Sequence, residues 1–434
     1  MAEMGRSPIS GNARPPWSSR FLTTWTIPAA ASAAFALIAV TYTVWWYPVV
    51  YHLNIWPVPG DCWTSYFAAS ALIHGHLGRI YGRQNGLIAF PGIAVVLAPS
   101  VAISRGLHLW IGAPYTAVST PTAWLALEPI DLLAGCLALF SFDAVARRLR
   151  VSRPRRAFLA MAEVIALWDL LIYQWHPEDA FAVALGLWAL LAALDGRWRR
   201  AGWLMGAGIA FQPLLLLALV VVIALAKRKE IAGIVVRSIV PAVVLVSGPL
   251  IANPSRTLRA IVDQPNSTVL NRSTPWVHLA PHLAHGMVAS GPARSVAVVA
   301  AAVSSWLVCR RNPRIEVCVW MLAVCFATRV FFEPVMVSYY MWPALAVAVL
   351  IASRGSRFRF ASTCALVTFS TFYVHEWRAE WKSWTILVVS IGAALVVSRP
   401  AKSSAPMRMS PSRGAGRTSE EKGHEHVKEL LGVG

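Results

Sequence analysis

Long apolar runs separated by short polar segments dominate the chain. Runs of about 17–25 residues, the length that crosses about 30 Å of hydrocarbon, recur from residue 24 to residue 398. This pattern predicts an all-α, polytopic membrane protein with a single membrane domain over residues 21–399. The regular spans are expected at 24–48, 157–174, 180–194, 231–252, 288–309, 315–332, 335–353, 360–375 and 382–398.

Two further apolar stretches are interrupted. Residues 87–142 contain several Pro and Gly residues that interrupt the apolar run. This stretch could therefore cross the membrane once, once with an additional re-entrant piece, or three times. Residues 201–226 have Gln212-Pro213 at their midpoint and are expected to form two half-spans that turn back. The total is then about 12 transmembrane helices. Two large extracytoplasmic loops are expected at 50–86, with a short helix from Cys62 to Ile73, and at 253–287.

The charge distribution predicts the orientation. Only 14% of residues are charged and 57% are apolar, which excludes a soluble enzyme or a disordered chain. The net charge of +19 comes from basic clusters between apolar runs, such as 147–156, 197–200, 227–229, 310–314 and 354–359. The positive-inside rule places these clusters, and both termini, in the cytoplasm of a multi-pass cell-membrane protein. Membrane lipids, and not nucleic acid, are the expected partner of this charge.

The chain ends carry a different composition. Residues 1–20 form a basic tail, and residues 400–434 are rich in Ser, Gly and charged residues, so the latter are expected to be disordered. Six scattered Cys form no CxxC pair, and nucleotide-binding or hydrolase motifs are absent. Because Pro281 interrupts the spacing of His278, His282 and His285, no metal site and no cofactor are expected.

Placing a carboxylate at or within the membrane costs free energy, so carboxylates there are candidates for function. Asp61 follows Pro57-Val58-Pro59-Gly60 and opens a predicted helix, so it suits an N-cap, a catalytic base, or both. Downstream, Arg79 and Tyr81 add groups that suit a sugar bound to a phosphate.

Two more acidic positions have plausible structural roles. Glu178 and Asp179 follow His176-Pro177 and favour a helix start. Arg329 and Glu333 are four residues apart, which predicts an ion pair within one helix.

Three short motifs stand out along the chain. The first loop reads Gly60-Asp61-x4-Tyr66-x-Ala68-Ala69, with Gly75 and Tyr81 following. The second motif is Phe90-Pro91-Gly92 with Ala98-Pro99, and the third is Ala201-Gly202-x3-Gly206 with Phe211-Gln212-Pro213-Leu214. Through these motifs the chain resembles the GT-C-type membrane glycosyltransferases, and in particular the bacterial polyprenol-phosphate-mannose-dependent α-mannosyltransferase-like family. The resemblance covers roughly residues 24–398.

The resemblance implies a polyprenyl-phosphate-linked sugar donor and a lipid or glycan acceptor on the extracytoplasmic side. It implies that Asp61 is the catalytic base, with Arg79, Arg272 or Arg329 holding the donor phosphate. The remaining substrate contacts would come from Tyr66, Tyr81, His176, Glu178, Asp179 and Tyr340. Two positions depart from the family pattern: Gln212 replaces a usual Lys, and Tyr339-Tyr340 replaces His-Tyr.

A different class of function also fits the sequence. A transporter or flippase of a lipid-linked or small polar substrate would use acids within the spans, namely Glu128, Asp131, Glu163 and Asp169. The missing internal repeat and the unequal outer loops argue against it. A membrane protein without catalytic activity is the third alternative.

Overall fold

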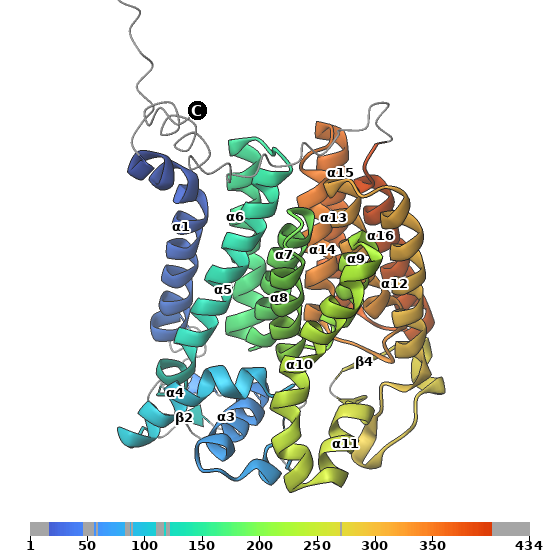
Figure 1. Ribbon diagram of the computed structural model, residues 1–434. Coiled ribbons are helices and arrows are strands. Elements are labelled where there is room, and N and C mark those ends of the chain that lie inside the picture. Colours follow the sequence, from blue (N-terminus) through green and yellow to red (C-terminus); the bar gives the residue numbers. More distant parts are fainter. Residues whose placement is uncertain are drawn as a thin grey trace, which may run out of the picture. The chain divides into compact units, whose positions relative to one another are not determined.

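The computed structural model describes residues 17–46, 56–57, 60–82, 87, 90–109, 117–118, 122–269 and 271–401. Of the residues that the structure describes, 81% are helical. Among the described residues, seven helices are long and apolar enough to cross a membrane. They are α1 (Trp17–Thr41), α5 (Thr122–Arg148), α7 (Pro177–Leu194), α10 (Arg228–Ala252), α12 (Gly291–Arg311), α13 (Ile315–Phe332) and α16 (Glu380–Ser398) (Figure 1). The prediction of an all-α membrane protein is confirmed at this level.

Eight shorter α-helices lie between the long ones in the described part of the chain. They are α3 (Gly60–Ile73), α4 (Gly92–Gly106), α6 (Arg153–Leu167), α8 (Trp198–Phe211), α9 (Leu215–Leu225), α11 (Pro254–Asp263), α14 (Trp342–Ala352) and α15 (Arg357–Tyr373). A π-helical segment, η3 (Trp168–Tyr173), continues α6. The count of twelve spans stays a prediction, and most of both predicted tails lies outside the described residues.

The two interrupted stretches have distinct structures. Residues 87–142 contain the short α4 and most of the long α5, which agrees with one long crossing helix and an additional short piece. Residues 201–226 form α8 and α9, and the chain turns at Gln212-Pro213-Leu214. The predicted pair of short helices is therefore present.

Glycines of α8 allow it to approach α10 closely. A Cβ atom on Gly206 would lie 2.3 Å from the Arg237 carbonyl oxygen, and one on Gly202 would lie 3.0 Å from the Arg237 Cβ. Small residues four apart let helix backbones approach in this way, as is common in membrane proteins. The Gly202-x3-Gly206 motif thus has a packing role.

Side-chain contacts define two opposite ends of the helices. At the first, called the basic end, arginines join segments that are distant in sequence. These contacts are Arg148 with Asp195, Arg155 with the Ser353 carbonyl, Arg310 with the Ala226 carbonyl, and Arg354 with Glu316. Arginines of the predicted clusters 147–156, 310–314 and 354–359 therefore make their contacts at one end of the helices.

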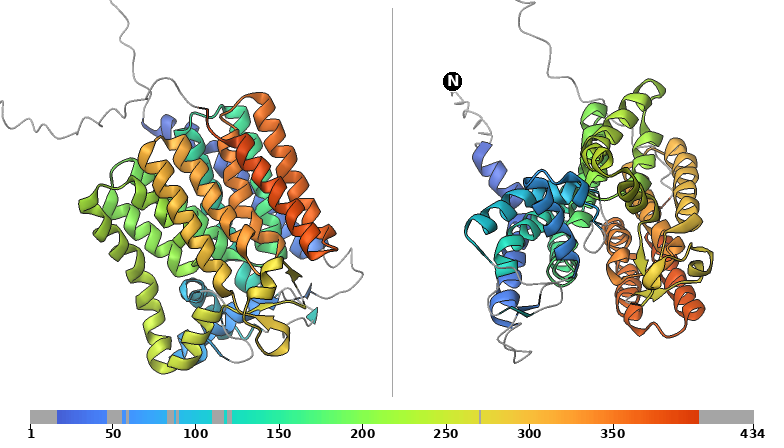
Figure 2. Two further views of the ribbon diagram at one scale, coloured as in Figure 1. Left: turned by 90° about the vertical axis from the view of Figure 1, so that its right-hand side faces the viewer. Right: turned by 90° about the horizontal axis from the view of Figure 1, so that it is seen from below.

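The opposite ends of the same helices are called the site end. The helices α3, α4 and α11 lie there (Figures 1 and 2). Contacts there join Asp61 with His176, Arg329 with Asp179, Arg294 with Glu333, and His278 with Glu380.

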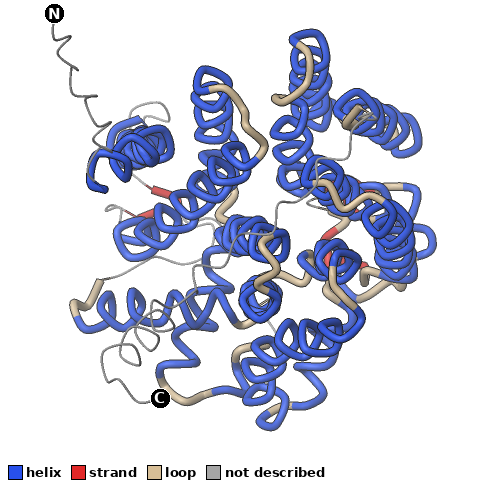
Figure 3. The backbone as a smooth tube through the Cα atoms, turned by 45° about the horizontal axis from the view of Figure 1, so that its top comes forward, coloured by secondary structure: helices blue, strands red, loops and turns tan. Residues whose placement is uncertain are grey.

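Short strands fix the connections at the site end. The structure describes three antiparallel pairs of two-residue strands among a predominantly helical chain (Figure 3). β3 (Asn266–Ser267) pairs with β5 (Met287–Val288). β4 (Arg272–Ser273) pairs with β6 (Val335–Met336), which directly follows α13. The predicted loop 253–287 is thus held against the end of α13, and a core of Val277, Ala280, Val288 and Val335 packs beneath it.

Candidate active site

Asp61 lies in the first turn of α3 and contacts His176, which directly precedes α7. The Asp61 Oδ2 atom is 3.1 Å from the His176 Nε2 atom. The Asp61 side chain is 49% exposed, whereas the His176 side chain is only 9% exposed. The carboxylate can therefore be reached from outside while its partner is enclosed. Among the described contacts this side chain pairs with the imidazole and does not cap α3.

His176 is held on three sides. Its Nδ1 atom is 2.9 Å from Oε1 of Glu178, and its ring stacks on the Tyr339 ring with centroids 3.7 Å apart. Before it, Trp175 is buried and takes a φ of 59°, a left-handed conformation that is strained for a residue with a side chain. Pro177 then starts α7. The local backbone thus directs the imidazole between two carboxylates.

The pKa values of this pair move in opposite directions. Burial alone would raise the pKa of Asp61, but the hydrogen bond and positive charge of His176 outweigh burial, so the net pKa is lowered. For His176, burial would lower the pKa, but the Asp61 and Glu178 carboxylates raise it to about 10. At neutral pH the imidazole is therefore protonated and Asp61 is ionised.

This ion pair gives a prediction for stability against pH. A raised pKa means that the His176 contribution is complete below about pH 6.5 and is lost as the pH rises through about 10. The contribution of Asp61, whose pKa is lowered, is present above pH 3.8 and disappears as the pH falls through the lowered value. Thermal unfolding in detergent should show the advantage of wild type over His176→Phe shrinking from pH 7 to pH 10. An advantage that stays constant over this range would contradict the assignment.

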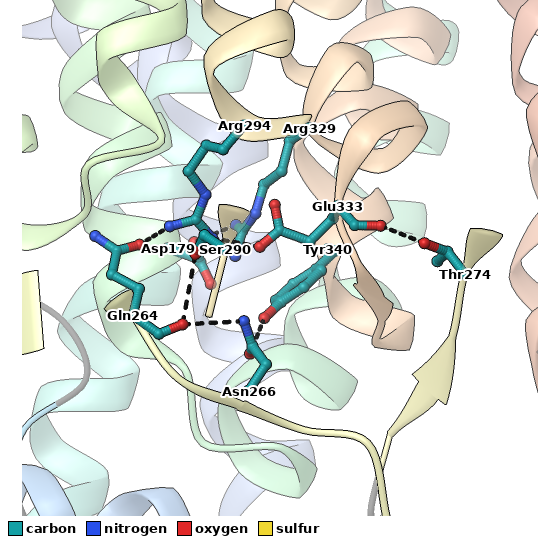
Figure 4. A network of polar contacts seen from close by, with 9 residues as sticks. All are labelled: Asp179, Gln264, Asn266, Thr274, Ser290, Arg294, Arg329, Glu333 and Tyr340. Atoms are coloured by element: carbon teal, nitrogen blue, oxygen red, sulfur yellow. Dashed lines mark hydrogen bonds and ion pairs between the residues drawn. The ribbon is translucent and has the colours of Figure 1, made fainter. Parts of the chain in front are cut away.

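A second cluster lies beside the first and includes Asp179, Arg329 and Tyr340 (Figure 4). Arg329 Nη1 is 3.7 Å from Asp179 Oδ1, and the guanidinium lies 3.8 Å from the centroid of the Tyr340 ring. Tyr340 in turn contacts Tyr339 edge-on, with centroids 4.9 Å apart. The two clusters are therefore joined through the Tyr339-Tyr340 pair and through the neighbouring residues Glu178 and Asp179.

The predicted ion pair between Arg329 and Glu333 is wrong. Glu333 instead pairs with Arg294 at the start of α12 (Figure 4). Glu333 is the residue after α13, where the chain leaves the helix, so the four-residue spacing does not place its carboxylate on the helix face that Arg329 occupies. Arg329 is thereby left facing Asp179.

Three residues that complete this network were not identified as site residues from the sequence: Gln264, Asn266 and Arg294. Gln212 was noted there only as a departure from the family pattern. Gln264 contacts Arg294, and the Tyr340 hydroxyl donates a 3.1 Å hydrogen bond to the Asn266 side-chain oxygen (Figure 4). Gln212, at the turn between α8 and α9, has its side chain beside Asp179. The lone Arg294 at the start of an apolar span was the one available signal, because such a residue usually has a buried partner.

Four of the sequence-predicted site residues are not brought into these clusters. Tyr66 and Tyr81 are buried in the hydrophobic core, where Tyr66 contacts Trp63 and Phe67. Arg79 is exposed in the short helix η2 (Leu77–Arg79). Arg272 lies in β4 and donates to the His375 carbonyl.

His176 and the neighbouring carboxylates are also residue types that can bind a metal ion. In the described part of the chain, one group, His176, Glu178 and Asp179, brings its ligand atoms within 4.8 Å of one another. A divalent ion there would require the imidazole to give up its proton and a hydrogen bond. The observed contacts instead place positive charge on the imidazolium and on Arg329. We therefore treat these residues as a hydrogen-bonded ion cluster.

Comparison with known proteins adds no family assignment. No protein-family model matches the chain, and a search of curated proteins finds no match. Fold and site together define an all-α membrane protein with a half-exposed, imidazolium-paired carboxylate at one helix end.

Proposed function

We propose that the protein is a membrane glycosyltransferase that moves a mannose-like sugar from a polyprenyl-phosphate donor to an extracytoplasmic lipid or glycan acceptor. The observation that carries the proposal is the Asp61 carboxylate, reachable from outside and paired with the enclosed His176. A general base must be ionised and within reach of the proton that it removes. The lowered pKa of Asp61 supports the first requirement at neutral pH. Its half-exposed side chain leaves room for an acceptor to approach.

The reaction needs one base and no added redox agent. The acceptor hydroxyl oxygen attacks the anomeric carbon of the donor sugar while the bond from that carbon to the phosphate oxygen breaks. The hydroxyl proton passes to Asp61, and the electron pair of the broken bond leaves with the polyprenyl phosphate. Because the phosphate is a stable anion, no second carboxyl group is required as an acid, in contrast to most glycosidases.

The neighbouring residues have supporting roles in this reaction. His176, which is itself held by Glu178, orients the Asp61 carboxylate and keeps it ionised. Arg329 is the strongest of the three phosphate-binding candidates because a chain of contacts joins it to the Asp61 site. Its guanidinium lies against the Tyr340 ring, and Tyr340 contacts Tyr339. The Tyr339 ring in turn stacks on His176. A guanidinium suits a phosphate because its fork of donors matches two oxygens. Arg79 and Arg272 lie outside this chain of contacts.

The same proposal fixes the orientation of the protein. The basic end would face the cytoplasm and the site end the exterior, in a multi-pass cell-membrane protein of twelve spans with both termini inside. The clustering of arginines at one end supports this orientation. The donor's isoprenoid tail would then stay in the bilayer with its sugar at the level of Asp61.

A donor-turnover assay tests the function directly. Purified protein is incubated with radiolabelled polyprenyl-phosphate mannose and candidate glycolipid or glycan acceptors. We expect label to appear on an acceptor and polyprenyl phosphate to be released. If the donor instead crosses a reconstituted bilayer unchanged, the transferase proposal is wrong.

That second outcome would favour the transporter alternative, for which α5 supplies one observation. Asp131 is fully buried there, and neither of its carboxylate oxygens has a hydrogen-bond partner among the described residues. Glu128, one turn earlier, is also buried. Such acids can carry protons in transporters. Glu163, by contrast, accepts a 3.1 Å hydrogen bond from Trp342, which gives it a structural role.

A further inference from the structure

A large cavity lies at the basic end, opposite the candidate active site. Its volume is about 770 Å³, and it is bordered by the turn between α7 and α8, by the first turns of α8 and by Glu230 of α10. A second cavity of about 370 Å³ lies on the other side of the same turn, against the ends of α5 and α7. Arg197 and Arg200 line both cavities.

The charge around the larger cavity is unbalanced. Arg197, Arg199 and Arg200 line it together with a single carboxylate, Glu230. In the described part of the chain, none of these three guanidinium groups makes an ion pair or a hydrogen bond. Asp195, the nearest acid in sequence, is already paired with Arg148 at 2.9 Å. Three unpaired guanidinium groups around one space are suited to an anion with several oxygen atoms.

The surroundings of the arginines indicate that the anion has an apolar part. Trp198 and Trp203 line the same cavity, and Trp203 is 45% exposed. Tryptophan is enriched at the level of lipid headgroups because its ring is apolar and its N–H is polar. Beyond Glu230, α10 exposes the apolar side chains of Val236 and Val243 along its length. A ligand that combined a phosphate with hydrocarbon chains would match both parts.

We propose that the cavity lined by Arg197, Arg199 and Arg200 binds the phosphate group of an anionic phospholipid of the adjacent leaflet. The headgroup phosphate would accept hydrogen bonds from the arginines, and the acyl chains would lie along α10. Basic recesses between transmembrane helices recognise anionic headgroups in this manner. The site is separate from the Asp61 cluster and does not depend on the proposed glycosyl transfer.

Lipid binding to the full-length protein in neutral detergent tests the assignment. Phosphatidylglycerol, phosphatidylcholine and inorganic phosphate are titrated separately, and binding is followed by native mass spectrometry or thermal shift. We expect phosphatidylglycerol to bind at least about ten-fold more tightly than phosphatidylcholine, because the arginines attract the net negative charge that only phosphatidylglycerol carries. The triple variant Arg197→Gln, Arg199→Gln, Arg200→Gln should lose this preference, and Arg197→Gln alone should weaken it.

A matched triple variant separates a site from a general charge effect. Arg311→Gln, Arg357→Gln, Arg359→Gln removes the same charge from the same end, away from the cavity, and should retain the preference. Equal binding of the two lipids would overturn the proposal, as would an equal loss in both triple variants. Displacement of phosphatidylglycerol by millimolar inorganic phosphate would show a free-phosphate site and would overturn the lipid assignment.

Discussion

Replacing Asp61 by asparagine is expected to reduce sugar transfer by about 10²–10⁴-fold, the usual contribution of a general base. The amide keeps the size of the side chain but cannot accept the acceptor's proton. It also leaves the His176 imidazole with one fewer carboxylate, which lowers the pKa of His176 from its raised value. The measurement is the initial rate of label transfer from radiolabelled polyprenyl-phosphate mannose by purified variant and wild type.

The control for this variant is Glu376→Gln. Glu376 is a carboxylate at the same end of the molecule and is 67% exposed. Its ion-pair partner at 3.6 Å, Arg378, is 87% exposed. The Glu376→Gln variant should transfer sugar at the wild-type rate. Full activity of Asp61→Asn would show that Asp61 is not the base, whatever the protein's function.

Replacing Arg294 by alanine is expected to have the largest effect on stability. It removes the ion-pair partner of Glu333, whose side chain is only 1% exposed, and leaves that enclosed carboxylate without a paired cation. Breaking a buried pair from one side costs about 3–5 kcal/mol. Because the Arg294 side chain is 30% exposed, we expect the lower part of this range. The measurement is the free energy of unfolding in detergent micelles.

A paired control distinguishes this effect from a simple loss of charge. Arg378→Ala breaks the exposed pair with Glu376 and should change stability by less than about 1 kcal/mol. The double variant Arg294→Ala, Glu333→Gln should recover part of the loss, because no unpaired carboxylate remains at position 333. An Arg294→Ala protein as stable as Arg378→Ala would show that Glu333 has another partner.

The helices could be predicted from the sequence to a large extent because their boundaries have local causes. The break at Gln212-Pro213 is such a case, since proline cannot continue the hydrogen bonding of α8. The positions of α7 and α13 follow from apolar runs that end at charged or turn residues. The number of crossings does not follow in the same way, because α8 and α9 are each shorter than a bilayer is thick.

The candidate site could be predicted only in part. Asp61, His176 and Glu178 come from two segments more than 100 residues apart, and sequence alone indicated each as a candidate without showing that they touch. The pairing of Arg329 with Asp179, and not with Glu333, depends on how α7 packs against the end of α13. Spacing within one helix cannot reveal a contact between two. Tyr66 and Tyr81 lie in the hydrophobic core and outside the two clusters, because a residue at a motif position can also serve packing.

The most direct test of the account is the sidedness of position 61. A variant with its six native cysteines replaced would carry Asp61→Cys, or Arg357→Cys at the basic end as a reference. Each is treated with a membrane-impermeant maleimide in intact cells and again after permeabilisation. The account predicts that position 61 is labelled in intact cells and that position 357 is labelled only after permeabilisation. Labelling in the reverse order would place the carboxylate in the cytoplasm and contradict transfer to an extracytoplasmic acceptor.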